Sequence, residues 1–164
     1  MSDIVWSVDP EQDSTEDLMT RMREFGAAVL EPKGISFRFE SPGMPSSTLP
    51  PQVKSDLYLI FKEAVNNAVK YSGCTELSVT LVRERGHIVL RITDDGKGFD
   101  TQHVQSTSGG GNGLPNMRKR AAELGATLSI TSAEGKGTAI ELLFVPDGRA
   151  KSLDAMTDAP AAAE

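Results

Sequence analysis

Three polar side chains in the middle of the chain have the spacing of one helix edge. Glu63, Asn67 and Lys70 lie at positions i, i+4 and i+7, and at roughly 100° per residue they fall within about 60° of one another around a helix. Carboxylate and amide oxygens suit Mg²⁺, and an ammonium group binds phosphate as a point charge. The row could hold a metal-bound phosphate, or it could be an ordinary solvated helix face.

A long amphipathic helix is predicted to carry this row. Apolar residues recur at steps of three and four, the period of a helix with one buried face; they are Val53, Leu57, Ile60, Phe61, Ala64, Val65 and Ala68. Pro51 is acceptable in the first turn of a helix, and Gly73 is a natural stop. We therefore expect a helix from about Pro51 to Ser72, with the polar row bordering its buried face.

A second candidate is the turn Asp94-Asp95-Gly96-Lys97-Gly98, which directly follows a predicted strand. Its glycines allow a flat ligand to approach the backbone closely. A carboxylate held there can accept a hydrogen bond from an exocyclic amine, such as that of adenine. A simple hairpin or bulge would explain a D-x-G-x-G pattern equally well.

Two further glycine-rich stretches could contact a ligand. Gly109 to Leu114 leads into a predicted helix, where free backbone N–H groups and the helix dipole favour phosphate. It lacks the G-x-x-x-x-G-K-[ST] spacing of a P-loop, and a flexible linker is the alternative. Gly135 to Thr138 reads as a hairpin turn, after which the Thr138 hydroxyl could reach the edge of a base.

The order of the remaining elements predicts an α+β fold. Helices are expected at 13–30, 51–72 and 114–124, the first of them capped by Asp13 or Ser14, and strands at 35–40, 76–84, 87–93, 126–131 and 138–145. The segment 101–111 is expected to be a mobile loop. Strands come partly in hairpins and outnumber helices, which favours two layers with helices on one face of a mixed sheet.

Composition excludes several broad classes. The 164 residues carry a formal net charge of -6, which argues against a general binder of nucleic acid or of membrane surfaces. Cys74 is the only cysteine, so an internal disulfide is impossible and a reducing compartment fits. There is neither an apolar run of about 18 residues nor a secretion signal, so we expect a cytoplasmic segment without membrane contact.

Taken together, the motifs resemble a known superfamily. An E-x-x-x-N helix, D-x-G-x-G, a glycine-rich loop ending in G-x-G-L and then G-x-G-T follow the order of the nucleotide-binding boxes of the gyrase, Hsp90, histidine kinase and MutL ATPases. In detail, 62–72 and 111–120 are similar to the catalytic ATP-binding domain of bacterial sensor histidine kinases, in the branch that pairs with NarL-type response regulators. The resemblance covers about 13–145 and implies a Bergerat-type α/β sandwich with about three helices.

The resemblance implies roles for individual residues toward ATP and Mg²⁺. Asn67 would ligate Mg²⁺, and Glu63 would be a nearby ligand or would polarise the attacking nucleophile. Lys70 would contact phosphate. Asp95 would accept from the adenine amine, supported by Thr138. The other implied nucleotide contacts are Tyr71 on the packing or ribose side, Gly96 and Gly98 around adenine, and Gly111, Asn112, Gly113 and Leu114 in the lid over the phosphates.

One departure from the histidine kinase pattern concerns the phosphoacceptor. The two histidines are His87, at the start of a strand, and His103, in the predicted loop; neither lies on a helix beside acidic residues. The expected organisation is therefore a junction over 1–12 that includes Trp6, a catalytic domain over 13–146 and a disordered tail over 147–164. The partners would be a histidine-bearing dimerisation domain, in the same protein or in trans, and a response regulator.

Two other functions stay open at this stage. An anti-sigma-factor serine kinase of the same superfamily would use the same boxes, although the Trp6 junction and the Lys70-Tyr71-Ser72 ending favour the histidine kinase. A degenerate module that binds a partner and no nucleotide is the third, and the intact Glu63 and Asn67 argue against it. For the chain alone we expect Mg-ATP binding with little or no turnover, and a full-length protein that is membrane-anchored through an upstream part.

Overall fold

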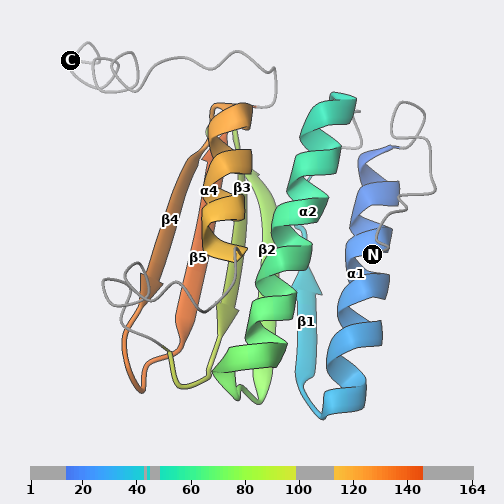
Figure 1. The fold of residues 1–164 in the computed structure, drawn as a ribbon. Helices are drawn as coiled ribbons and strands as arrows, with labels where there is room; N and C mark the ends of the chain where they lie inside the picture. The colour runs from blue at the N-terminus through green and yellow to red at the C-terminus, as the bar shows by residue number, and fades with distance from the viewer. Residues whose placement is uncertain (1–13, 43, 45–48, 99–112, 146–164) are drawn as a thin grey trace.

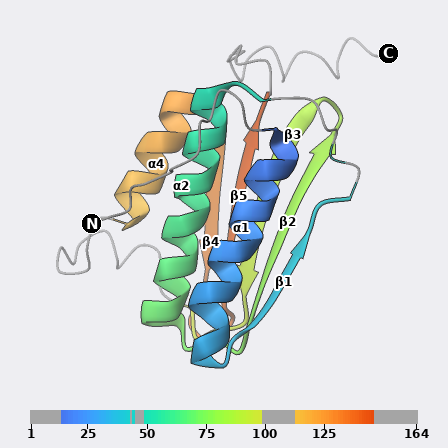
Figure 2. The same ribbon diagram turned by 90° about the vertical axis from the view of Figure 1, so that its right-hand side faces the viewer.

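The chain forms two layers, a sheet and a set of helices that covers one of its faces (Figures 1 and 2). The computed structural model describes residues 14–42, 44, 49–98 and 113–145. The helices are α1 (Thr15–Leu30), α2 (Pro51–Asn67) and α4 (Gly113–Leu124), with a 3₁₀ turn at Glu31–Lys33 and a π-helical turn at Ala68–Ser72. The strands are β1 (Ser36–Glu40), β2 (Glu76–Glu84), β3 (His87–Asp94), β4 (Thr127–Ser132) and β5 (Thr138–Phe144).

The sheet has five strands in the order β1-β2-β3-β5-β4. β1 pairs with β2 in parallel, and the other three pairings are antiparallel. The predicted α+β fold, with helices on one face of a mixed and mostly antiparallel sheet, is confirmed. None of the helices in the described part of the chain is long and apolar enough to cross a membrane.

Strand alternation builds the core between the two layers. Leu90 and Ile92 of β3 and Ile140 and Leu142 of β5 are buried against the helices, because every second side chain of a strand points to the same face. From the helical layer, α2 contributes the residues whose period identified it, and Leu57, Ile60 and Val65 are fully buried there. This shared core fixes the ends of β3, β5 and α2 relative to one another.

The first helix begins at a capping box. The Ser14 hydroxyl accepts from the Asp17 N–H at 3.2 Å, and the Asp17 carboxylate accepts from the Ser14 N–H at 3.0 Å, which satisfies two orphan donors. Of the two predicted caps, Ser14 is the one observed, and Asp13 lies outside the described residues. Further along α1, Gly26 faces the ring of Phe37 so closely that a Cβ would overlap it.

Several boundaries differ from the prediction. The helix that was expected to run to Ser72 is α-helical only to Asn67 and ends in the π-helical turn, after which Gly73 adopts a left-handed conformation with φ of 63°. β3 extends to Asp94, one residue further than expected, and α4 begins at Gly113. The predicted junction over 1–12, loop over 101–111 and tail over 147–164 lie outside the described residues.

Candidate functional site

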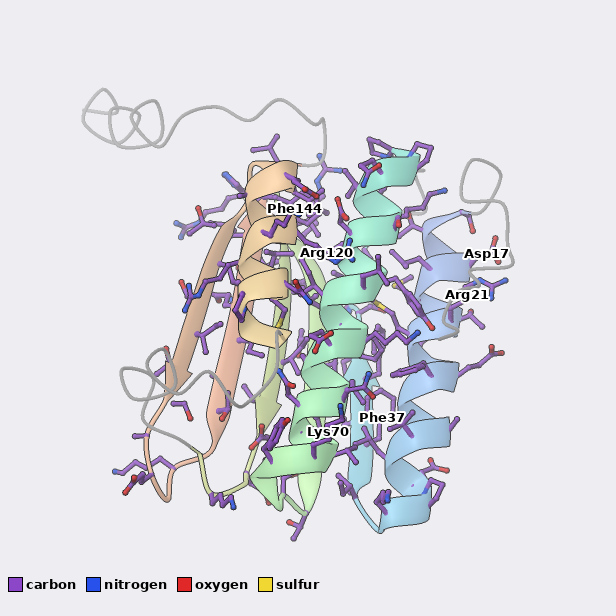
Figure 3. All side chains as sticks on the ribbon, in the orientation of Figure 1. Asp17, Arg21, Phe37, Lys70, Arg120 and Phe144 are labelled. Atoms are coloured by element: carbon purple, nitrogen blue, oxygen red, sulfur yellow. The ribbon has the colours of Figure 1, made fainter. Side chains whose placement is uncertain are left out.

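The polar row of the sequence lies at the C-terminal end of α2. Glu63 and Asn67 are half-buried on the α-helical part, whereas Lys70 and Tyr71 are exposed on the π-helical turn; Figure 3 labels Lys70 near the lower end of α2. The predicted angles assumed a uniform α-helix, and the wider π turn changes the direction of Lys70 relative to Glu63 and Asn67. Such turns are frequent at functional sites.

The end of α2 is in direct contact with the glycine-rich turn after β3. The Lys97 N–H donates to the Ser72 carbonyl at 2.8 Å. Gly96 lies against the same residue, because a Cβ on Gly96 would overlap the Ser72 carbonyl oxygen and come within 2.7 Å of the Ser72 Cβ. The glycine at this position therefore permits a close approach between the turn and the helix.

A third segment, the turn between β4 and β5, joins the same place. The Gly135 N–H donates to the Lys97 carbonyl at 2.6 Å. A Cβ on Gly98 would overlap the carbonyl of Ala133, and one on Gly137 would overlap the carbonyl of Asp94. Both glycines have positive φ, 66° and 77°, which disfavours other residues. Backbone contacts thus hold the two turns together at the end of α2.

The carboxylate of Asp95, the predicted adenine acceptor, is already engaged. It accepts from the Thr75 N–H at 2.8 Å, the Thr75 hydroxyl at 2.6 Å and the Glu76 N–H at 2.9 Å. These hydrogen bonds, the one from the Thr75 hydroxyl foremost, lower the pKa of Asp95 below its ordinary value. Asp95 therefore ties the start of β2 to the end of β3, and the geometry does not favour it as a ligand acceptor.

Asp94 has the surroundings that were expected of Asp95. It follows Leu90 and Ile92 in alternation and so lies on the helix-covered face of the sheet. Its carboxylate accepts from the Gly96 N–H at 2.8 Å, and burial raises its pKa above the ordinary value. Sequence reasoning missed Asp94, although it is the first aspartate of the D-x-G-x-G spacing and would have been found by counting back from Gly96.

Thr138 lies beside Asp94. The two residues are opposite partners in the β3–β5 register, and antiparallel partners share one face of a sheet. The Thr138 hydroxyl lies 2.9 Å from the Ser132 hydroxyl, which also donates to the Gly137 carbonyl at 3.0 Å. The structure therefore brings Asp94, Gly96, Gly98 and Thr138 together at the end of α2.

A groove of about 250 Å³ lies between α2 and α4. It is lined by Leu59, Lys62, Glu63, Asn66, Asn116, Met117 and Arg120. Glu63 is thus the one residue of the predicted row that lines the groove. Sequence reasoning did not single out the amide side chains of Asn66 and Asn116, which lie directly beside the expected Asn67 and in the first turn of α4.

The remaining predicted residues can be placed only in part. Gly113 begins α4, as expected of a glycine that precedes a helix, while Gly111 and Asn112 lie outside the described residues, as does the side chain of Leu114. Within the described residues, no group of three or more His, Cys, Asp and Glu side chains could hold a metal ion. Magnesium bound here would use amide, phosphate and water oxygens, which the ion accepts.

Known proteins resemble this chain in sequence and in fold. Residues 52–149 match the family described as histidine kinase-, DNA gyrase B-, and HSP90-like ATPase. The chain is 38% identical over 94 residues to the sensor protein VraS of Staphylococcus haemolyticus and of Staphylococcus aureus. That stretch is 57% of this chain and 26% of each relative, so the chain spans about a quarter of the length of these relatives.

Solved structures extend the comparison to the fold. The histidine kinase domain of the Erythrobacter litoralis EL346 blue-light activated histidine kinase is 18% identical with a TM-score of 0.64, over 81% of this chain and 63% of that one. The mycobacterial sensor histidine kinase MprB is 23% identical with a TM-score of 0.59, over 82% and 97%. The sequence match covers more than half of the chain, and the chain therefore belongs to the family of histidine kinase-, DNA gyrase B- and HSP90-like ATPases.

Proposed function

We propose that this domain binds Mg-ATP and transfers its γ-phosphoryl group to a histidine on a dimerisation domain outside this chain, for relay to a response regulator. The observation that carries the proposal is the convergence of the β3 turn, the β4–β5 turn and the end of α2 around Asp94. The relatives named as sensor proteins and histidine kinases favour this acceptor over the sigma-binding alternative. The proposal includes a cytoplasmic location for this domain within a membrane-anchored protein.

In this proposal Asp94, not Asp95, accepts from the adenine amine. Its carboxylate lies on the helix-covered face, has Thr138 opposite it and keeps acceptor capacity beyond the Gly96 N–H. The Thr138 hydroxyl supports the base directly or through water. Gly96 and Gly98 have no side chains, so a flat base can lie against the backbone of the turn.

The residues that would bind the metal and the phosphates lie on α2, on the π-helical turn after it and at the start of α4. Asn67 would supply an amide oxygen to Mg²⁺ and Lys70 a charge to the phosphates, with Tyr71 on the ribose side. Gly113, together with Gly111, Asn112 and Leu114, would close over the phosphates, where the N–H groups at the start of α4 favour anions. Magnesium, when bound, neutralises charge on the transferring phosphoryl group.

Catalysis by these residues would consist mainly of positioning. An imidazole nitrogen of the acceptor histidine forms the new N–P bond while the bond from the γ-phosphorus to the bridging oxygen breaks, which leaves ADP. Glu63 lines the groove beside α4, where its carboxylate can accept the imidazole N–H and orient the attacking nitrogen. The acceptor histidine is supplied by another segment, so the chain alone would bind nucleotide with little or no turnover.

Calorimetry with a non-hydrolysable ATP analogue and Mg²⁺ tests the proposal. We expect binding by the parent chain, and an Asp94→Asn variant whose preference for ATP over GTP analogues falls by about 10- to 100-fold, the range for one hydrogen bond to a charged group. The Asp95→Asn variant should keep the preference. An absence of heat at millimolar analogue would refute ATP binding. If Asp95→Asn lost the preference for the ATP analogue and Asp94→Asn kept it, Asp95 would be the residue that accepts from the adenine amine.

A further inference from the structure

A carboxylate is enclosed between α2 and α4, away from the residues assigned to ATP. The side chain of Asp56 on α2 is 1% exposed. One of its oxygens accepts from the Gln52 amide at 3.0 Å and the other from Arg120 Nη1 at 3.4 Å. Figure 3 shows Arg120 extending from α4 toward α2. The two helices are therefore joined by an ion pair whose acidic partner is fully buried.

A gain in folding stability does not by itself explain a buried ion pair. Removing a carboxylate from water costs free energy that its ion pair rarely exceeds, and an apolar side chain of similar volume is often as stable or more so. A buried ion pair does fix the relative position of its two elements, because the charge is costly when its partner moves away. The Asp56–Arg120 pair is thus suited to holding α4 at one place on α2.

Among the described side chains of α4, those that pack on the core are Met117, Ala121 and Leu124, while Pro115, Asn116, Arg118 and Lys119 are exposed. These three residues, at i, i+4 and i+7, lie on one line along the helix, and contacts along one line leave rotation about that line weakly restrained. Arg120 adds a contact to one side of it, which restrains the rotation.

The rotation of α4 matters for the groove and for the phosphates. Arg120 and Glu63 line the same groove, and Gly113 at the start of α4 is seven residues before Arg120, about 10 Å along the helix. We propose that the Asp56–Arg120 pair is a positioning element of the ATP site, which sets where the start of α4 meets the phosphates and how wide the groove beside Glu63 is. This inference rests on the function proposed above.

The test compares ligands with and without phosphates. Arg120→Gln and Asp56→Asn should each weaken binding of the Mg-bound ATP analogue by about tenfold, a typical coupling between separate sites. Adenosine, followed by NMR titration, should bind each variant within about twofold of the parent, because the base contacts the β3 turn and not α4. Arg120→Lys should restore most of the affinity, since a single nitrogen makes the contact.

Arg91→Gln is the matched control. Arg91 on β3 donates to Glu141 on β5 at 2.6 Å and also pairs with Glu84. The variant therefore loses ion pairs but leaves α4 untouched, and its affinity for the analogue should not change. If single variants fold poorly, the double variant Asp56→Asn/Arg120→Gln carries no unpaired charge and should show the same loss as either single.

The two proposals fail in different ways. A parent chain that binds no analogue would overturn the proposed function. A parent and an Arg120→Gln variant that bind the analogue equally well would overturn the positioning role alone. An equal loss for adenosine and for the analogue would also overturn it, because the pair would then support the fold in general.

Discussion

Substituting Gly96 with alanine would test the contact between the β3 turn and the end of α2. The added Cβ would overlap the Ser72 carbonyl oxygen and would lie 2.7 Å from the Ser72 Cβ and 2.9 Å from its carbonyl carbon. Ser72 cannot yield easily, because its hydroxyl donates to the Ala68 carbonyl at 2.7 Å and accepts from the Cys74 N–H at 3.1 Å. The turn would therefore have to move away from the helix.

The cost follows from two parts of the structure. Overpacking of a closely packed position typically costs about 1–3 kcal/mol. The movement would also break the hydrogen bond from the Lys97 N–H to the Ser72 carbonyl, for about 0.5–1.5 kcal/mol more. Gly96 is not among the described residues with positive φ, so no strain of the left-handed region is added. We expect Gly96→Ala to lower the free energy of unfolding by about 2–4 kcal/mol.

Urea denaturation of Gly96→Ala and Gly135→Ala provides the assay and its control. Gly135 has φ of 80° and open space where its Cβ would be, so its substitution reports backbone strain alone, about 1–2 kcal/mol. Calorimetry under conditions where both variants are folded should show weaker binding of the ATP analogue by Gly96→Ala, because displacement of the turn moves Asp94 away from the base.

The reasoning would be refuted by a Gly96→Ala variant as stable as the parent, or by one that loses no more than Gly135→Ala. If Gly96→Ala is destabilised as expected yet binds the analogue as tightly as the parent, the packing contact is supported and Asp94 does not contact adenine. Both measurements are needed, since stability and affinity report different consequences of the same displacement.

The remaining predictions concern the first helix and the second aspartate. The lowered pKa of Asp95 means that its charged form stabilises the fold above the unfolded pKa of about 3.9, and that this stability is lost as the pH falls through the lower, folded pKa. The stability difference between the parent and Asp95→Asn should therefore shrink below about pH 4 in urea denaturation at a series of pH values, and a constant difference would contradict the Thr75 contacts. Gly26→Ala should destabilise by about 1 kcal/mol, because overlap with the Phe37 ring outweighs the gain in helix propensity; a second change, Phe37→Leu, should recover part of the loss. Ser14→Ala should cost about 1 kcal/mol through loss of the capping box, and a thermal midpoint equal to that of the parent would speak against the cap.

The arrangement of layers was predictable because periodicity and sheet geometry agree along this chain. The three- and four-residue steps from Val53 to Ala68 identified α2, and two strands predicted on either side of Arg85-Gly86 identified the hairpin β2–β3. Gly96 and Gly98 were expected to let a flat ligand approach the backbone, and in the structure they lie close to Ser72 and Ala133. These features depend on local sequence, which a single chain reveals.

Other features depend on contacts that local sequence does not encode. The π-helical turn at Ala68–Ser72 contacts Gly96 and Lys97, far along the chain. The choice between Asp94 and Asp95 depends on Thr75, which is twenty residues from Asp95. The pair Asp56–Arg120 joins positions sixty-four residues apart, and each of them reads in the sequence as an ordinary charged residue.

The adenine side and the phosphate side of the proposed site are held by different kinds of interaction. Around Asp94 the backbone itself makes the contacts, through Gly96, Gly98 and Gly137, so a change there disturbs packing and base binding together. On α4 the described contacts with the rest of the fold include Met117, Ala121 and Leu124 and the Asp56–Arg120 pair, whose basic partner is partly exposed. A change at the phosphate side would thus act through one ion pair between two helices, whereas a change at the adenine side would also disturb the backbone packing.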